Sequence, residues 1–248
     1  MKFNSFTSAF SSLIFSIKCP SCLKSSMEDF ANYGICAECK RSIQTEVSIT
    51  FRGPLQIFAG SKYTSNISRI ILAAKEDNQL QARVFLAECL TQSLKKAIEE
   101  ISLKRNQSIK NVVIIPIPSR KSADRKRGFA HIELLVTRLM VLNQLTNQTI
   151  NQAISFQVLD CLSHSRKISD QSSLNFNERA MNMKGAFTVD QVMYFESYPT
   201  KNSNSVVFLV DDLVTTGATV QAANSALSAL GGRVDGVLAS CATQGFTH

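Results

Sequence analysis

The run Val206-Val-Phe-Leu-Val-Asp-Asp-Leu-Val-Thr-Thr-Gly-Ala-Thr219 sets the architecture expected for this chain. Five apolar residues, four of them β-branched or aromatic, lead into two adjacent carboxylates. An apolar run of this kind predicts a strand that is buried on both faces, as in parallel sheets. A helical pattern follows over residues 220–230. We therefore expect an α/β protein with a mostly parallel sheet flanked by helices.

The polar half of this run combines groups that can bind a sugar with groups that can bind a phosphate. Asp211 and Asp212 end the predicted strand, at the edge where open α/β sheets bind ligands. The turn into the helix consists of Thr215, Thr216, Gly217, Ala218 and Thr219. Its backbone N–H groups, the helix dipole and three hydroxyls favour an anion, and glycine allows a close approach. Carboxylates beside such a turn suit a ribose 5-phosphate, whereas each feature alone is also common at a solvated turn or a helix N-cap.

The composition indicates a globular protein with a preference for anions. The chain has 248 residues, of which 44% are apolar, and its 27 Lys and Arg residues outnumber its 19 Asp and Glu residues. The resulting net charge of +8 favours polyphosphates, nucleic acid or anionic lipid, without choosing among them. No stretch approaches the roughly 20 apolar residues of a membrane-spanning helix, and residues 3–17 lack the apolar core of an export signal. We expect no membrane insertion and a cytoplasmic location.

Two Cys-x-x-Cys pairs indicate a metal site. Cys19-Pro-Ser-Cys22 and Cys36-Ala-Glu-Cys39 have 13 residues between them. Each pair can form a knuckle with two thiolates facing one ion, so that the two pairs complete a tetrahedral site for structural Zn²⁺. A redox dithiol or two disulfides are the alternatives. Residues 1–45 are therefore expected to form a small zinc-ribbon-like domain, and residues 46–248 a second domain.

A second apolar run, Asn111-Val-Val-Ile-Ile-Pro-Ile-Pro118, predicts another strand that is buried on both faces. A basic segment follows it directly, with one acid, Asp124, among five cations: Arg120, Lys121, Arg125, Lys126 and Arg127. A loop after a parallel strand lies at the ligand-binding edge of the sheet, where these cations can neutralise a pyrophosphate or a strand of nucleic acid. On an exposed helix, the same charges would form a solvated face.

The remaining elements are predicted from hydrophobic periodicity. Helices are expected at residues 67–74, 80–101 and 132–140, and strands at residues 156–162, 185–189 and 233–242. Gly53-Pro54 marks residues 40–60 as a linker, and residues 190–205 are expected to be an irregular surface loop. Lys75, at the end of its predicted helix, is expected only to complement the helix dipole.

Together these motifs resemble the ComF family of competence-associated proteins, which combine an N-terminal zinc ribbon with a type I phosphoribosyltransferase-like domain. The resemblance covers nearly the whole chain. It rests on the four clustered cysteines, on Pro116-Ile-Pro118 with Arg127-Gly-Phe129, and on the run from Asp211 to Thr219. A central motif matches at Arg166, Gln171, Leu174, Arg179, Asn182 and Gly185-Ala-Phe187. The family usually has Asn and Gln after Arg-Gly-Phe. Here Ala130 and His131 stand in those places, so that any amide contact is lost. His131 can replace one such contact, but we expect it to be exposed.

The resemblance implies a binding site for phosphoribosyl pyrophosphate (PRPP) together with Mg²⁺. Asp211 and Asp212 would accept hydrogen bonds from the ribose hydroxyls, and the turn of residues 215–219 would bind the 5-phosphate. The pyrophosphate would be neutralised by Arg120, Arg125 and Arg127. Arg166 is implied to be catalytic, within a polar stretch, residues 164–182, that closes over the site. Mg²⁺ would bridge oxygens of the pyrophosphate and the ribose.

Two functions are compatible with this resemblance. The first is an enzyme that transfers phosphoribose from PRPP to an unidentified acceptor and releases pyrophosphate. The second is a non-catalytic competence protein that binds single-stranded DNA and retains the PRPP pocket. Both imply a role in DNA uptake and natural transformation, with other DNA-uptake proteins as candidate partners.

Overall fold

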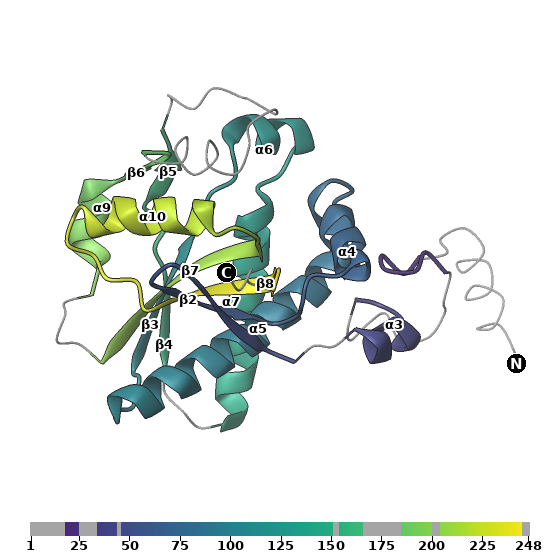
Figure 1. Ribbon diagram of the computed structural model, residues 1–248, viewed down its shortest axis with the longest axis horizontal. Coiled ribbons are helices and arrows are strands. Elements are labelled where there is room, and N and C mark those ends of the chain that lie inside the picture. The colour runs from purple at the N-terminus through teal and green to yellow at the C-terminus, as the bar shows by residue number, and fades with distance from the viewer. Residues whose placement is uncertain are drawn as a thin grey trace, which may run out of the picture.

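The computed structural model describes residues 18–24, 34–43, 46–150, 154–165, 185–199 and 204–244, with the backbone alone for residues 144–150. A six-stranded sheet in the order β1-β2-β8-β7-β3-β4 lies at its centre (Figure 1). The strands are β1 (Ser48–Arg52), β2 (Leu55–Ala59), β3 (Asn111–Pro116), β4 (Ser155–Val158), β7 (Ser205–Val214) and β8 (Gly236–Ala242). β1 and β2 are antiparallel, and every other neighbouring pair is parallel. The prediction of a mostly parallel α/β sheet is confirmed.

Helices cover both faces of this sheet (Figure 1). One face is covered by α4 (Ser65–Lys75), α5 (Leu80–Arg105) and α7 (His131–Ile150), and the other by α10 (Ala218–Ser228), with α9 (Gln191–Ser197) beside it. An antiparallel pair, β5 (Leu162–His164) and β6 (Phe187–Val189), packs on the α10 side. Two short helices, α3 (Ala37–Ser42) and α6 (Lys121–Arg127), complete the described elements. No described helix is both long and apolar enough to span a membrane.

β7 is the strand predicted from the run that begins at Val206, and it pairs with β3 on one side and β8 on the other. Its residues 205–210 are all buried. Val206 and Phe208 belong to the apolar cluster on the side of α5 and α7, whereas Val207 and Leu209 belong to the cluster on the side of α10. Because helices cover both faces, the run is continuously apolar rather than alternating.

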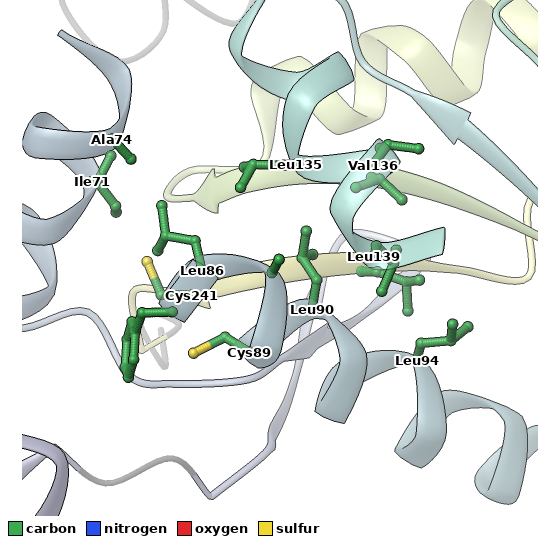
Figure 2. Packing of buried hydrophobic residues seen from close by; sticks show 14 of the residues in the cluster. Ile71, Ala74, Leu86, Cys89, Leu90, Leu94, Leu135, Val136, Leu139 and Cys241 are labelled. Carbon is green, nitrogen blue, oxygen red and sulfur yellow. The ribbon is translucent and has the colours of Figure 1, made fainter. Parts of the chain in front are cut away.

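α5 is the helix around which the first of these clusters packs. Its Leu86, Leu90 and Leu94 have no exposed surface, and the same is true of Leu135 and Leu139 of α7. Figure 2 shows these side chains in one layer between the helices and the strand that carries Cys241. The core thus fixes α5 and α7 to the sheet and places the residues at their ends relative to the strands.

The prediction of a linker over residues 40–60 is wrong, because most of this segment forms the hairpin of β1 and β2. The two strands pair from Ser48–Ala59 to Arg52–Leu55 around a two-residue turn. That turn is Gly53-Pro54, in which Gly53 has a φ of +59°. The dipeptide that indicates a domain boundary in the sequence is therefore a tight turn inside the sheet.

Two predictions for the second half of the chain are also wrong. The sequence predicts a single strand over residues 156–162, but the structure has two separate strands there, β4 and β5. The chain leaves the six-stranded sheet after β4 and buries Leu159 and Cys161 in the apolar cluster on the side of α10. Residues 190–205 contain α9 instead of an irregular loop. The side chain of Asp190 accepts the backbone N–H of Met193 at 3.1 Å and so caps this helix, and Tyr194 anchors it in the same cluster.

Candidate functional site

Most of the predicted PRPP-site residues that the structure describes follow β3 or lie at the end of β7, two adjacent parallel strands whose carboxyl ends form one edge of the sheet. Asp211 and Asp212 lie near the end of β7, which leads through a short turn into α10. The segment after β3 leads into α6 and then α7. The turn between α4 and α5 reaches the same edge, because Lys75 contacts β7 and Glu76 contacts α6. Three connections that are far apart in the sequence therefore meet here.

Asp212 is a buried carboxylate with two nitrogen partners. Its side chain is 4% exposed, and Lys75 Nζ donates a hydrogen bond to its Oδ2 over 3.1 Å. His131 Nε2 lies 3.3 Å from the same oxygen. Burial alone would raise the pKa of Asp212, but the contact with His131 and the charge of Lys75 outweigh burial and hold this pKa below its usual range. Asp212 is therefore an ionised group whose Oδ2 already has two partners.

Asp211 has a different environment from its neighbour. It is partly open to solvent, and its Oδ1 accepts the backbone N–H of Asp212 over 2.8 Å. Burial of the carboxyl atoms and the nearby charge of Asp212 raise the pKa of Asp211 above its usual range. Adjacent carboxyls whose pKa values are pushed apart can take different roles. Asp211 is the more exposed residue of this pair.

The sequence analysis missed both partners of Asp212. The prediction that His131 is exposed is wrong, since its side chain has no exposed surface and packs against Asp212. Lys75 does more than complement the dipole of α4, because it forms an ion pair with the same carboxylate. Residue 131 stands out in the sequence as a departure from the ComF pattern, but nothing in the sequence connects it with Asp212, and nothing marks Lys75.

The turn after β7 has the backbone shape of an anion-binding turn. Gly217 is the N-cap of α10 and has a φ of +81°. Thr215 is exposed and Thr216 and Thr219 are partly exposed, so these hydroxyls and the first N–H groups of α10 can reach a ligand. A Cβ at position 217 would lie 2.5 Å from the Cβ of Arg52. A residue that replaced Gly217 would also have to adopt the positive φ, which L residues with a side chain rarely do. Glycine is therefore required here for both conformation and space.

The basic segment after β3 is a helix, α6, rather than the expected loop. It ends at Arg127 and is capped by Gly128, which has a φ of +81°. Lys121, Arg125 and Lys126 are exposed on this helix, and Arg120, also exposed, precedes it as the N-cap. The segment follows a parallel strand, but it forms the exposed helix that the sequence analysis gave as the alternative, on which these charges form a solvated face.

Arg127 differs from the other cations of α6 because its side chain is only 9% exposed. Its Nε lies 3.4 Å from a carboxylate oxygen of Glu76, and its Nη1 lies 3.6 Å from one of Asp124. These contacts connect α6 to the turn between α4 and α5. Of the three arginines predicted to meet a pyrophosphate, Arg120 and Arg125 lie on the surface, while Arg127 is engaged with two acids.

Most of the central motif lies outside the described residues. This applies to Arg166, Gln171, Leu174, Arg179 and Asn182. The flanking strands β5 and β6 are described, and the ring of His164 in β5 lies 4.7 Å from that of Phe187 in β6. His164 Nε2 donates a hydrogen bond of 2.9 Å to the carbonyl of Pro118, so this strand pair lies against the segment between β3 and α6.

The four cysteines of the two pairs come together as predicted. The Sγ atoms of Cys19, Cys22, Cys36 and Cys39 all lie within 4.8 Å of one another. The N–H of Cys39 approaches Cys36 Sγ at 3.5 Å, and the N–H of Cys36 approaches Cys19 Sγ at 3.4 Å. All seven cysteines of the chain are described and all are free thiols, so the alternative of two disulfides is not what the structure shows. Four thiols at this spacing can bind one metal ion.

The cysteine segment packs against α4 and α5. Ile35 and Ile43 belong to the same buried cluster as the helices on that face of the sheet. Arg69 of α4 donates a hydrogen bond of 2.8 Å to the carbonyl of Ser21, between the first two cysteines. The cysteine segment is therefore in direct contact with α4, the helix that ends at Lys75.

No family model and no curated protein matches this chain. The assignment of the site therefore depends on the residues described above.

Proposed function

We propose that this protein is a phosphoribosyltransferase-like protein of the ComF type, which binds PRPP and transfers its phosphoribosyl group to an acceptor. One observation carries the proposal: the partly exposed Asp211 and the glycine turn of residues 215–219 lie at the same end of β7. A central parallel strand that leads through such a turn into a helix supports a type I phosphoribosyltransferase-like architecture.

The two halves of this site suit the two halves of a phosphorylated ribose. Asp211 would accept hydrogen bonds from ribose hydroxyls, and the N–H groups and hydroxyls of the turn would bind the 5-phosphate. Asp212 would contribute chiefly its negative charge, because its Oδ2 is already bound by Lys75 and lies close to His131.

The transfer requires the protein to position the reactants and to neutralise charge, and it requires no protein nucleophile. The bond between C1 of the ribose and a pyrophosphate oxygen breaks, with its electron pair leaving on the pyrophosphate. A lone pair of the acceptor forms the new bond to C1, and the acceptor loses a proton. Arg120 and Arg125 would neutralise the departing pyrophosphate, and Arg166 would act from the stretch that follows β5. Bound Mg²⁺ would add positive charge, and Asp211 offers the kind of oxygen ligand that it prefers.

The PRPP site is tested by calorimetry with Mg²⁺ present. We expect the change Asp211→Asn to weaken PRPP binding at least tenfold, which corresponds to about 1.4 kcal/mol, because the ribose loses one of the two carboxyl oxygens as a partner. The matched control is Asp160→Asn, which neutralises an exposed carboxylate after β4 and should leave the affinity unchanged. Equal PRPP affinity in the wild type and in Asp211→Asn would remove the basis of the proposal.

A second candidate function, binding of single-stranded DNA, is favoured by the exposed cations of α6. Each phosphate contact with a single strand contributes about 0.7 to the slope of log affinity against log salt concentration. We expect Arg125→Glu with Lys126→Glu to lower this slope by about 1.4 in fluorescence titrations with an oligothymidine. The control is Lys95→Glu with Lys104→Glu, which makes the same charge change at exposed positions of α5. A slope that is equal in both double variants would exclude α6 as the DNA contact.

The four cysteines are proposed to bind one structural Zn²⁺. Four thiolates fill a tetrahedral coordination sphere, which leaves no position for a substrate or water. The metal would therefore stabilise the segment and not take part in transfer. With the resemblance to ComF proteins, these features support a cytoplasmic role in DNA uptake.

A further inference from the structure

Arg52 lies directly behind the anion-binding turn and is the most heavily bonded cation near it. It ends β1, and its side chain is largely buried. Nε donates to the carbonyl of Thr215 over 2.6 Å, and Nη2 donates to the carbonyl of Thr243 over 2.7 Å. Nη1 donates to the carbonyl of Phe51 over 2.8 Å and to Thr50 Oγ1 over 3.1 Å. One guanidinium thus joins the hairpin, the turn and the segment after β8.

The charge of Arg52 is not neutralised by an acid among the described residues. The acceptors that surround the guanidinium there are main-chain carbonyls and threonine hydroxyls, all of them neutral. A guanidinium remains protonated even when it is buried. A full positive charge with neutral partners therefore lies next to the turn, in surroundings where charge–charge interactions are stronger than in water.

The bond from Arg52 to Thr215 also fixes the direction of a peptide group. The peptide between Thr215 and Thr216 is planar and trans, so its N–H points opposite to its C=O. Because the carbonyl of Thr215 points toward Arg52, the N–H of Thr216 points away from Arg52. Fixing the carbonyl therefore fixes the N–H that the turn can offer to an anion.

The aliphatic part of Arg52 fixes the other side of the turn. A Cβ built on Gly217 would lie 2.5 Å from Cβ, 2.6 Å from Cγ and 3.1 Å from Cδ of Arg52. The arginine stem therefore packs against the Cα of Gly217, while its head group binds the carbonyl two residues earlier. This close packing supports the positive φ at Gly217, which starts α10.

We propose that Arg52 is the positioning residue of the phosphate site: it orients the Thr216 N–H toward a phosphomonoester at residues 215–219 and supplies a buried positive charge behind it. This inference rests on the proposed function, because it assigns a role within the same site. The inference predicts that replacing Arg52 weakens the affinity for the sugar 5-phosphate and leaves the affinity for a pyrophosphate bound beside α6 unchanged.

The test uses ribose 5-phosphate and magnesium pyrophosphate as separate probes in calorimetry. We expect Arg52→Met to weaken ribose 5-phosphate at least tenfold and Arg52→Lys to weaken it less, because lysine keeps the charge but cannot bind both carbonyls. Pyrophosphate affinity should be the same in all three proteins. Equal ribose 5-phosphate affinity in the wild type and Arg52→Met would overturn the role of Arg52 and leave the proposed function intact. A wild type that binds no ribose 5-phosphate would overturn both.

A measurement on the wild type covers the case in which the variants do not fold. Adding inorganic phosphate to the isotope-labelled protein should shift the amide proton of Thr216 downfield by more than the amides of β1, because this N–H donates to the anion. A Thr216 amide that does not respond at phosphate concentrations that perturb the other residues of the turn would overturn the proposal.

Discussion

Replacing Cys36 with serine is expected to abolish binding of one zinc ion per chain and to unfold the segment that contains the four cysteines. Structural zinc contributes about 10–16 kcal/mol of binding free energy in zinc-finger peptides at neutral pH, and that energy is folding energy. The segment has few apolar residues of its own, and Ile35 and Ile43 belong to the buried cluster of α4, α5 and α7. Elemental analysis and limited proteolysis, before and after chelation, measure both effects.

The control for this change is Cys161→Ala, which removes a buried thiol outside the cluster. It should retain the metal, and the cysteine segment should resist protease as in the wild type. Protein purified under reducing conditions that contains no zinc, or a Cys36→Ser variant that retains it, would contradict the metal site.

Replacing Asp212 with alanine is expected to lower the free energy of unfolding by about 3 kcal/mol. The change leaves the fully buried ring of His131 without its neighbouring acceptor and leaves Lys75 without its ion-pair partner, and such losses cost about 1–5 kcal/mol. Lys75 is 31% exposed and can turn toward water, which moderates the cost. Urea unfolding measures the effect, and the exposed Asp160→Ala should change stability by no more than about 0.5 kcal/mol.

A double-mutant cycle distinguishes this mechanism from a simple loss of packing. Once Lys75 is replaced by methionine, the further change Asp212→Ala should cost at least about 1 kcal/mol less than it does alone, because the ion pair is already absent. Additive effects would mean that Lys75 and Asp212 do not interact in solution.

The contribution of Asp212 to the free energy of unfolding also depends on pH, because the pKa of Asp212 is depressed in the folded state. This contribution is present above the ordinary aspartate pKa of about 3.9 and is lost as the pH falls through the folded-state pKa.

The sequence predicted the parts of this molecule whose signals are local. β7, β3 and the glycine turn are each encoded within about a dozen consecutive residues, through continuous apolar runs and the need for a positive φ at Gly217. The cysteine cluster is likewise encoded by two short spacings. In each of these cases the residues that form the feature also determine it.

The missed parts are contacts between distant segments. Lys75 and Asp212 are 137 residues apart, and Arg52 and Thr215 are 163 apart, so no window of sequence contains both partners. Their positions follow from the packing of α4 on the sheet and from the hairpin at its edge, and a lone Lys or Arg at the end of an element gives no sign of this. The hairpin itself was missed because Gly53-Pro54 has the same composition in a linker as in a tight turn.

The pairing of β2 with β8 has a consequence for how the protein is made. Arg52 reaches Thr243, 191 residues later, and β8 is inserted between β2 and β7. A nascent chain that has left the ribosome only as far as residue 235 therefore has two unpaired strand edges in the middle of its sheet and lacks an acceptor of Arg52. Folding that begins during synthesis can complete this sheet only after β8 has emerged, and until then the open edges are available to chaperones or to other chains.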